Sequence, residues 1–295
     1  MNALRSRWSS FWFGAEGPTD LACCRIVFFG LLAIFYAPLQ LGAWGDVSPV
    51  FWRPVSFFKV FHLQAPSPTA LTMMALGWKV ALVASACGAA TRVSTLMAFV
   101  GGLYLLGLPH NFGKVHHFDA PVVIILGIMA LARCGDAYSV DRWLGRRRGR
   151  PSVGPSPEYR WPVRAVWLTL ALVFGSAGVA KLRHGGLAWI TSDNMAVLLL
   201  QHAYHVANRD PLTDWGVRLS QIPWACRAIA LATVLVELGY PLSLVSARAR
   251  RFFPAAMVCT LLGIRLLMGP TFTQFLICNV FWIPWDRVVR RFERN

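Results

Sequence analysis

Long apolar runs separated by short polar segments make up most of this chain. Each run approaches or reaches the ~17–25 residues that a helix needs to cross the hydrocarbon core of a bilayer. Proline residues lie near several ends of these runs, where a helix tolerates them. The pattern predicts eight membrane-spanning helices, over residues 20–41, 69–88, 92–110, 118–134, 162–182, 223–246, 251–269 and 271–286.

The composition supports a membrane protein. Of the 295 residues, 56% are hydrophobic and only 14% are charged. A soluble domain has roughly a quarter of its residues charged, whereas a bilayer removes that need. We therefore predict an all-α fold, a polytopic transmembrane helical bundle that forms a single domain over residues 1–295. The polar stretch "GRRRGRPSVGPSPEYR" divides its spans into two groups of four.

The distribution of basic residues predicts the orientation. The formal net charge of +16 does not come from one basic patch, so nucleic acid is not an expected partner. With the N-terminus in the cytoplasm, most arginines fall in the inner segments 1–19, 89–91, 135–161, 247–250 and the tail after residue 286. This bias and the even number of spans place both termini in the cytoplasm, in the cell inner (plasma) membrane with its lipids as partners.

The histidines all fall on the outer side of this topology. They occur in loops such as "LPHNFGKVHHFDAP" and "LLQHAYHVANRD", so a site would open outward. His116, His117 and Asp119 have the residue types of metal ligands, but adjacent histidines chelate one ion poorly and no HExxH pattern accompanies them. The i, i+3 pair His202 and His205 is better spaced, although histidines at a membrane interface more often only form hydrogen bonds. We predict no metal site.

Ionisable residues inside the apolar runs are candidate site residues, because charge is costly in lipid unless it is paired or hydrated. Glu237 is expected to pair with a cation such as Arg25 or Lys79, in an ion pair that is either structural or catalytic. Arg25 has the alternative of reaching the cytoplasmic headgroups. The internal cations outnumber this one acid. In one alternative, an anionic or electron-rich ligand binds at Arg25, Arg265 and Glu237 and balances the excess positive charge. In the other alternative, one amine stays neutral.

Lys181 is the candidate for that neutral amine. It closes an apolar run on the histidine-bearing side, and desolvation together with neighbouring cations disfavours its charged form. Under those conditions a lysine acts as a base or a nucleophile. The alternative function of Lys181 is a membrane-edge anchor, but Arg183 and His184, the next polar residues, are better placed for that.

Several segments, in order, resemble a known family. They are "TDLACCRIVFFGLL", "CGAATRVS", "KVHHFDAP", "DAYSVDRWL", "GSAGVAKLRHGGLAWI" and "VLVELGYPLSL". Over roughly residues 18–290 the chain resembles the HTTM (vitamin K-dependent gamma-carboxylase-like) family of membrane proteins.

The resemblance implies a chemistry for Lys181. In the carboxylases, a lysine in a Gly-x-x-Lys-Leu context deprotonates a reduced quinone, vitamin K hydroquinone. Oxygen then converts it into a strong base that removes a glutamate gamma-proton, and carbon dioxide adds to the carbanion. By this resemblance Lys181 is the base, and His116 or His117 matches a functional histidine in the loop before the fourth span.

The resemblance is incomplete in two places. The carboxylases carry a histidine in the seventh span where this chain has Arg265. The sequence also ends after the eighth span, without the large extracytoplasmic domain that binds a substrate propeptide. The resemblance therefore supports a quinol-type or other lipid-soluble ligand more than propeptide-directed carboxylation of a peptide or protein substrate.

Three functions follow from the sequence. The first is a membrane enzyme, carboxylase- or epoxidase-like, with Lys181 as general base. The second is a non-enzymatic membrane protein for maturation, export or immunity of a secreted peptide. The third, a transporter or channel, is suggested by the internal charges but lacks a matching pair of broken helices. The pattern defines no oligomeric state.

Overall fold

The chain folds entirely into helices and connecting segments. The computed structural model describes residues 2–114, 118–204 and 213–293, and no β-strand occurs within these ranges. Two compact units form: unit 1 comprises Met1–Val166 and Ile283–Asn295, and unit 2 comprises Trp167–Trp282. The boundary between them lies inside one long helix, a few residues after the polar stretch that divides the predicted spans.

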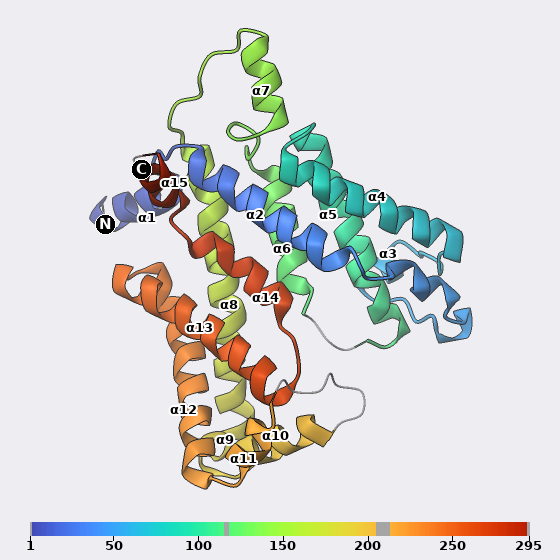
Figure 1. Ribbon diagram of the computed structural model, residues 1–295, viewed down its shortest axis with the longest axis vertical. Coiled ribbons are helices and arrows are strands. Elements are labelled where there is room, and N and C mark those ends of the chain that lie inside the picture. Colours follow the sequence, from blue (N-terminus) through green and yellow to red (C-terminus); the bar gives the residue numbers. More distant parts are fainter. Residues whose placement is uncertain (1, 115–117, 205–212, 294–295) are drawn as a thin grey trace. The chain divides into compact units, whose positions relative to one another are not determined.

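Unit 1 is built around four neighbouring helices. Helix α4 packs against α2 and α5, and α5 also packs against α6 (Figure 1). The elements of this unit are α1 (Asn2–Phe13), α2 (Thr19–Tyr36), η1 (Leu41–Asp46), η2 (Pro49–Phe51), α3 (Ser56–Val60), α4 (Pro68–Cys87), α5 (Thr91–Gly107), η3 (Leu108–Phe112), α6 (Ala120–Leu131), α7 (Val140–Arg147), η4 (Pro157–Tyr159), the start of α8 (Arg160–Gly185) and α15 (Trp285–Phe292).

Unit 2 contains most of α8 and the helices that follow it. Helix α10 contacts α11, α12 and α13, and a small core of Met195, Leu199, Cys226 and Ala230 lies among them (Figure 1). The elements of this unit after α8 are α9 (Ala188–Thr191), α10 (Asn194–Tyr204), α11 (Trp215–Ser220), α12 (Pro223–Gly239), η5 (Tyr240–Leu244), α13 (Ala247–Met268), α14 (Thr273–Cys278) and η6 (Asn279–Trp282).

Six helical segments in the described residues are long and apolar enough to cross a membrane. This confirms an all-helical fold and indicates a multi-pass membrane protein. The segments are Thr19–Tyr36, Pro68–Cys87, Thr91–Phe112, Pro157–Gly185, Pro223–Leu244 and Ala247–Met268. At the two other predicted spans the helices are shorter: α6 has 12 residues, which is ~18 Å of helix against a hydrocarbon core of ~30 Å.

Side chains at the helix ends fix where the long helices begin and stop. Ser67 caps α4 by accepting a hydrogen bond from Ala70 N, and Pro68 occupies the first turn, where its missing N–H costs nothing. Gly88 ends the same helix in the left-handed conformation, with φ +67°. These local signals reproduce the predicted start and end of this span to within one residue.

Asp141, at the start of α7, caps α5 from a distant part of the chain. Its Oδ1 accepts a hydrogen bond from Ala90 N (2.9 Å), and its Oδ2 accepts from Thr91 N (2.6 Å) and Thr91 Oγ1 (2.7 Å). Partial burial raises the pKa of Asp141, but the hydrogen bonds from Thr91 and Ala90 outweigh it and hold that pKa below its ordinary value of 3.8. The carboxylate therefore stabilises the fold as an anion.

Replacing Asp141 by Asn is expected to lower the stability at neutral pH, and by less at acid pH. Because the pKa is depressed in the folded state, the stabilisation is fully present above the unfolded value and is lost as the pH falls through the folded one. We expect Asp141→Asn to cost ~1 kcal/mol at pH 7, as for a lost helix cap, and progressively less as the pH falls below the ordinary value of 3.8. Thermal midpoints in detergent between pH 7 and 3 test this. Asp214→Asn, at an exposed position, is the control. If the thermal midpoints of Asp141→Asn and the wild type differ by the same amount at every pH, the Asp141 carboxylate does not stabilise the fold as an anion.

Candidate functional site

Lys181 and Glu237 form an ion pair between α8 and α12. Lys181 Nζ donates hydrogen bonds to both carboxylate oxygens of Glu237, at 2.6 Å to Oε1 and 2.7 Å to Oε2. Both side chains are largely shielded, with 24% of the Lys181 side chain and 11% of the Glu237 side chain exposed. The prediction that Glu237 pairs with an internal cation is confirmed, but the partner is the candidate base Lys181 and not Arg25 or Lys79, the two examples that the sequence suggested.

Small residues on α8 allow this close contact. A Cβ atom at Gly178 would lie only 3.0 Å from Glu237 Cβ, and one at Gly175 would lie 2.8 Å from Pro241 Cγ. Gly178 and Lys181 are three residues apart, so they share one face of the helix. Glycines on that face bring the backbone of α8 near α12, which is how small residues permit close helix packing in membranes. The "GSAGVAKL" stretch thus positions the amine against the carboxylate.

The pair lies in the wall of a cavity of about 470 Å³ inside unit 2. Among the described residues that line it, Lys181 and Glu237 are the only charged ones. Thr233 and Thr260 also line the cavity, but each hydroxyl donates to a carbonyl of its own helix. The apolar lining residues are Val173, Phe174 and Ala177 of α8, Trp189 of α9, Met195, Leu198 and Leu199 of α10, Ile229 and Ala232 of α12, Met257, Leu261, Gly263, Ile264, Leu267 and Met268 of α13, and Phe272 and Phe275.

This arrangement combines apolar walls with one polar point. A pocket of ~300–1,000 Å³ holds a small organic ligand, and a few polar groups in it fix the orientation of that ligand. Two of the three N–H bonds of a Lys181 ammonium point at Glu237, so one remains for a bound molecule. The Lys181 ammonium also lies 5.4 Å from the ring centroid of Trp189, within the range of a cation–π interaction. The cavity suits a lipid-soluble molecule with a single hydroxyl or carbonyl group near Lys181.

Arg25 has a structural function in unit 1. It is completely buried, so it does not reach the headgroups. Its guanidinium donates to four main-chain carbonyls, those of Cys134 (2.9 Å), Ser85 (2.7 Å), Ala86 (2.6 Å) and Tyr138 (2.6 Å). These bonds use four of the five N–H groups of an arginine and join α2, the end of α4 and the segment between α6 and α7. The contacts explain Arg25 without a ligand.

The other internal cations also bind main-chain carbonyls. Lys79 Nζ donates to Ala37 O (2.8 Å) and Leu39 O (2.9 Å), just beyond the end of α2. Arg265 donates to Gly269 O (2.8 Å) at the end of α13. Helix α13 lines the cavity through several residues, but Arg265 is not one of them. Of the three predicted ligand-binding residues Arg25, Arg265 and Glu237, the cavity therefore includes Glu237.

The predicted histidines His116 and His117 lie outside the described residues, as do His205 and the side chain of His202. Next to His117, Asp119 accepts a hydrogen bond from Tyr36 Oη (2.6 Å) and pairs with Lys114 at 3.2 Å. In the described part of the chain, no three His, Cys, Asp or Glu side chains are grouped to hold a metal ion.

Sequence reasoning missed Trp189 and the cavity itself. The available signal was the spacing of Gly175 and Gly178, which marks the face of α8 that packs closely on another helix.

In comparisons with known proteins, no family model, no curated protein and no solved structure matches this chain.

Proposed function

We propose that this protein is an integral membrane enzyme, similar to the vitamin K-dependent gamma-carboxylases, that acts on a quinol-type or other lipid-soluble ligand. The observation that carries the proposal is the Lys181–Glu237 pair in the wall of a 470 Å³ apolar cavity. Lys181 is the general base, and Glu237 is its proton partner. His116 or His117 assists, as the resemblance to the HTTM family implies.

The fit of the cavity to such a ligand supports this proposal. Its walls are carbon-rich, as a ring with an apolar tail requires, and it presents one ionisable pair to a ring hydroxyl. When bound, a reduced quinone would supply the reducing equivalents for a reaction with oxygen, with carbon dioxide as the carbon source of a carboxylation.

The pair can move a proton without leaving an unpaired charge. In the resting ion pair, Lys181 holds a proton that Glu237 can accept across the 2.6 Å hydrogen bond. Lys181 Nζ is then neutral and can accept a proton from a hydroxyl group in the cavity. Afterwards Lys181 is an ammonium and Glu237 is a neutral acid. The pair has gained one proton, and the ammonium remains beside the oxygen that lost it.

The topology belongs to the same proposal. Eight segments cross the cell inner (plasma) membrane, α6 and the segment Thr273–Trp282 among them, with both termini in the cytoplasm. The site then opens on the extracytoplasmic side. The positive-inside bias supports this orientation, and six or eight crossings both return the C-terminus to the side of the N-terminus.

Lys181→Ala is expected to abolish turnover. Loss of a general base typically costs ~10²–10⁴-fold in rate. Purified protein is incubated with a reduced quinone, oxygen and carbon dioxide, and formation of the quinone epoxide is followed by mass spectrometry. The exposed Lys59→Ala is the matched control and should retain wild-type turnover. Equal amounts of product from Lys181→Ala and the wild type contradict the proposal. The proposal is also contradicted if gently purified protein contains no lipid-soluble ligand and shows no activity.

A further inference from the structure

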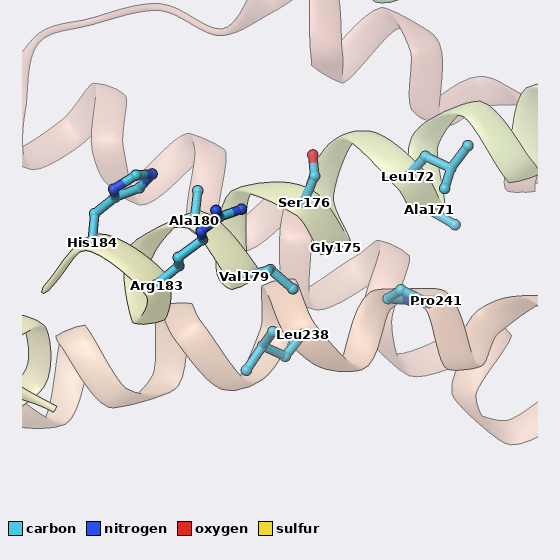
Figure 2. Close-up of a pocket in the computed structure, with 10 residues that line it drawn as sticks. All are labelled: Ala171, Leu172, Gly175, Ser176, Val179, Ala180, Arg183, His184, Leu238 and Pro241. Carbon is cyan, nitrogen blue, oxygen red and sulfur yellow. The ribbon is translucent and has the colours of Figure 1, made fainter. Parts of the chain in front are cut away.

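A second hollow lies on the opposite side of α8 from the Lys181 cavity. It has a volume of about 480 Å³, and α8 forms most of it, with Leu238 and Pro241 completing the wall (Figure 2). The residues of α8 that line it include Leu172, Ser176, Val179 and Arg183, spaced by three or four. The cavity instead uses Phe174, Ala177 and Lys181. At 3.6 residues per turn these two stripes face roughly opposite directions, so the groove is a separate site.

The groove is apolar along its length and basic at one end. Figure 2 shows Arg183 and His184 together at one end and Ala171 and Leu172 at the other. None of the residues that line it is acidic. The hydroxyl of Ser176 donates to Val173 O of its own helix, which leaves the Arg183 guanidinium and the His184 ring as the groups available to an anion.

The surroundings of the groove are suited to lipid. Leu172 is 63% exposed and Val179 is 55% exposed, on a helix that is long and apolar enough to cross a membrane. From Ala171 to His184 the helix rises by ~20 Å, while one leaflet of hydrocarbon is ~15 Å thick. One acyl chain can therefore lie along the groove with its headgroup beside Arg183.

We propose that this groove binds one anionic phospholipid. Its phosphate pairs with Arg183 and contacts His184, and one acyl chain lies along α8 against Leu238 and Pro241. The charge of the basic end selects an anionic headgroup, and the apolar length selects a molecule with an acyl chain. This proposal is independent of the chemistry of Lys181.

Lipid retention measured by native mass spectrometry tests the site. The full-length protein is released from detergent after incubation with phosphatidylglycerol or with phosphatidylcholine that carries the same acyl chains. We expect phosphatidylglycerol to be retained about fivefold better, since one basic side chain near an anionic surface contributes roughly that factor. Arg183→Gln should reduce its retention to the level of phosphatidylcholine. The exposed Arg227→Gln, elsewhere in unit 2, should not change it.

A second variant tests the apolar part of the site. Ser176→Phe places a ring in the groove without removing charge, and it should lower the retention of both lipids. Glycerol phosphate without acyl chains should not be retained by any protein. The proposal is overturned if the wild type retains both lipids equally, or if glycerol phosphate is retained as well as the lipid. It is also overturned if Arg183→Gln retains phosphatidylglycerol as well as the wild type does, or if Arg227→Gln loses as much of that retention as Arg183→Gln.

Discussion

Glu237→Leu is expected to destabilise the protein strongly, because it leaves the Lys181 ammonium without its partner in an apolar wall. Removing one member of a fully buried pair costs ~3–5 kcal/mol, and partial exposure of Lys181 to the cavity reduces this to ~2–4 kcal/mol. The thermal midpoint in detergent should fall by roughly 5–10 °C. Lys181→Met should have a similar effect through the unpaired carboxylate.

The double variant distinguishes the pair from its parts. With both charges removed, Lys181→Met/Glu237→Leu should recover most of the stability that either single variant loses, because an apolar pair of similar volume replaces the ion pair.

The same variants separate stability from catalysis. If the pair is only structural, the double variant recovers function together with its thermal midpoint. Under the proposed mechanism the double variant is stable but does not turn over, because the base is absent. Deficits that simply add in the double variant would show that the two side chains do not interact in the folded protein, and would contradict the site.

The long helices could be predicted from the sequence because their apolar runs are long and end at strong local signals. The sequence was less informative where a helix ends inside an apolar run. The first predicted span extends to residue 41, but α2 ends at Tyr36, before Pro38, which has no N–H to continue it. Beyond the end of the helix, the carbonyls of Ala37 and Leu39 accept hydrogen bonds from Lys79.

The fourth predicted span is longer than its helix for a similar reason. Helix α6 stops at Leu131, and the apolar residues after it turn so that Cys134 O can accept a hydrogen bond from Arg25. Hydropathy cannot distinguish such residues from a continuing helix, because Ala132 and Cys134 are apolar and are buried outside the helix as well. Arg25 and Cys134 are 109 residues apart, and this separation conceals the cause in the sequence.

The candidate site was predicted in part. Lys181 and Glu237 were each identified as costly charges in apolar runs, and the structure brings these two together. Their pairing could not be derived, since several cations competed for one acid and only the approach of α8 to α12 decides among them. The predicted ligand set of Arg25, Arg265 and Glu237 treats Arg25 as available to a ligand, whereas four main-chain carbonyls accept hydrogen bonds from it.

The segments that resemble the HTTM family fall into two groups in the structure. In unit 1, Arg25 of "TDLACCRIVFFGLL" donates to Cys134 O and to Tyr138 O of "DAYSVDRWL", and Asp141 of the same segment accepts from Thr91 of "CGAATRVS". In unit 2, "GSAGVAKLRHGGLAWI" and "VLVELGYPLSL" meet at the Lys181–Glu237 pair. The first group therefore contributes contacts that hold the fold, and the second group forms the proposed site.

Arg25→Met is expected to prevent accumulation of the folded protein. The variant removes four hydrogen bonds from a charged donor to main-chain carbonyls, and each such bond is worth ~1.5–3 kcal/mol. Even with relaxation, a cost above ~5 kcal/mol matches the whole stability of many domains. Expression and monodispersity after detergent extraction measure this effect.

Arg25→Lys should rescue the protein poorly, because one ammonium has three donors and cannot reach four carbonyls that surround a planar guanidinium. The matched control is Arg92→Met, since Arg92 is exposed and makes a 3.3 Å hydrogen bond to Leu131 O. Arg92→Met should accumulate to the level of the wild type, and its free energy of unfolding should change by no more than about 0.5 kcal/mol, as for most surface substitutions. Full accumulation and an unchanged thermal midpoint for Arg25→Lys would contradict the four-carbonyl junction. Loss in both arginine-25 variants with a normal Arg92→Met would place the requirement on the shape of the guanidinium rather than on positive charge in this region.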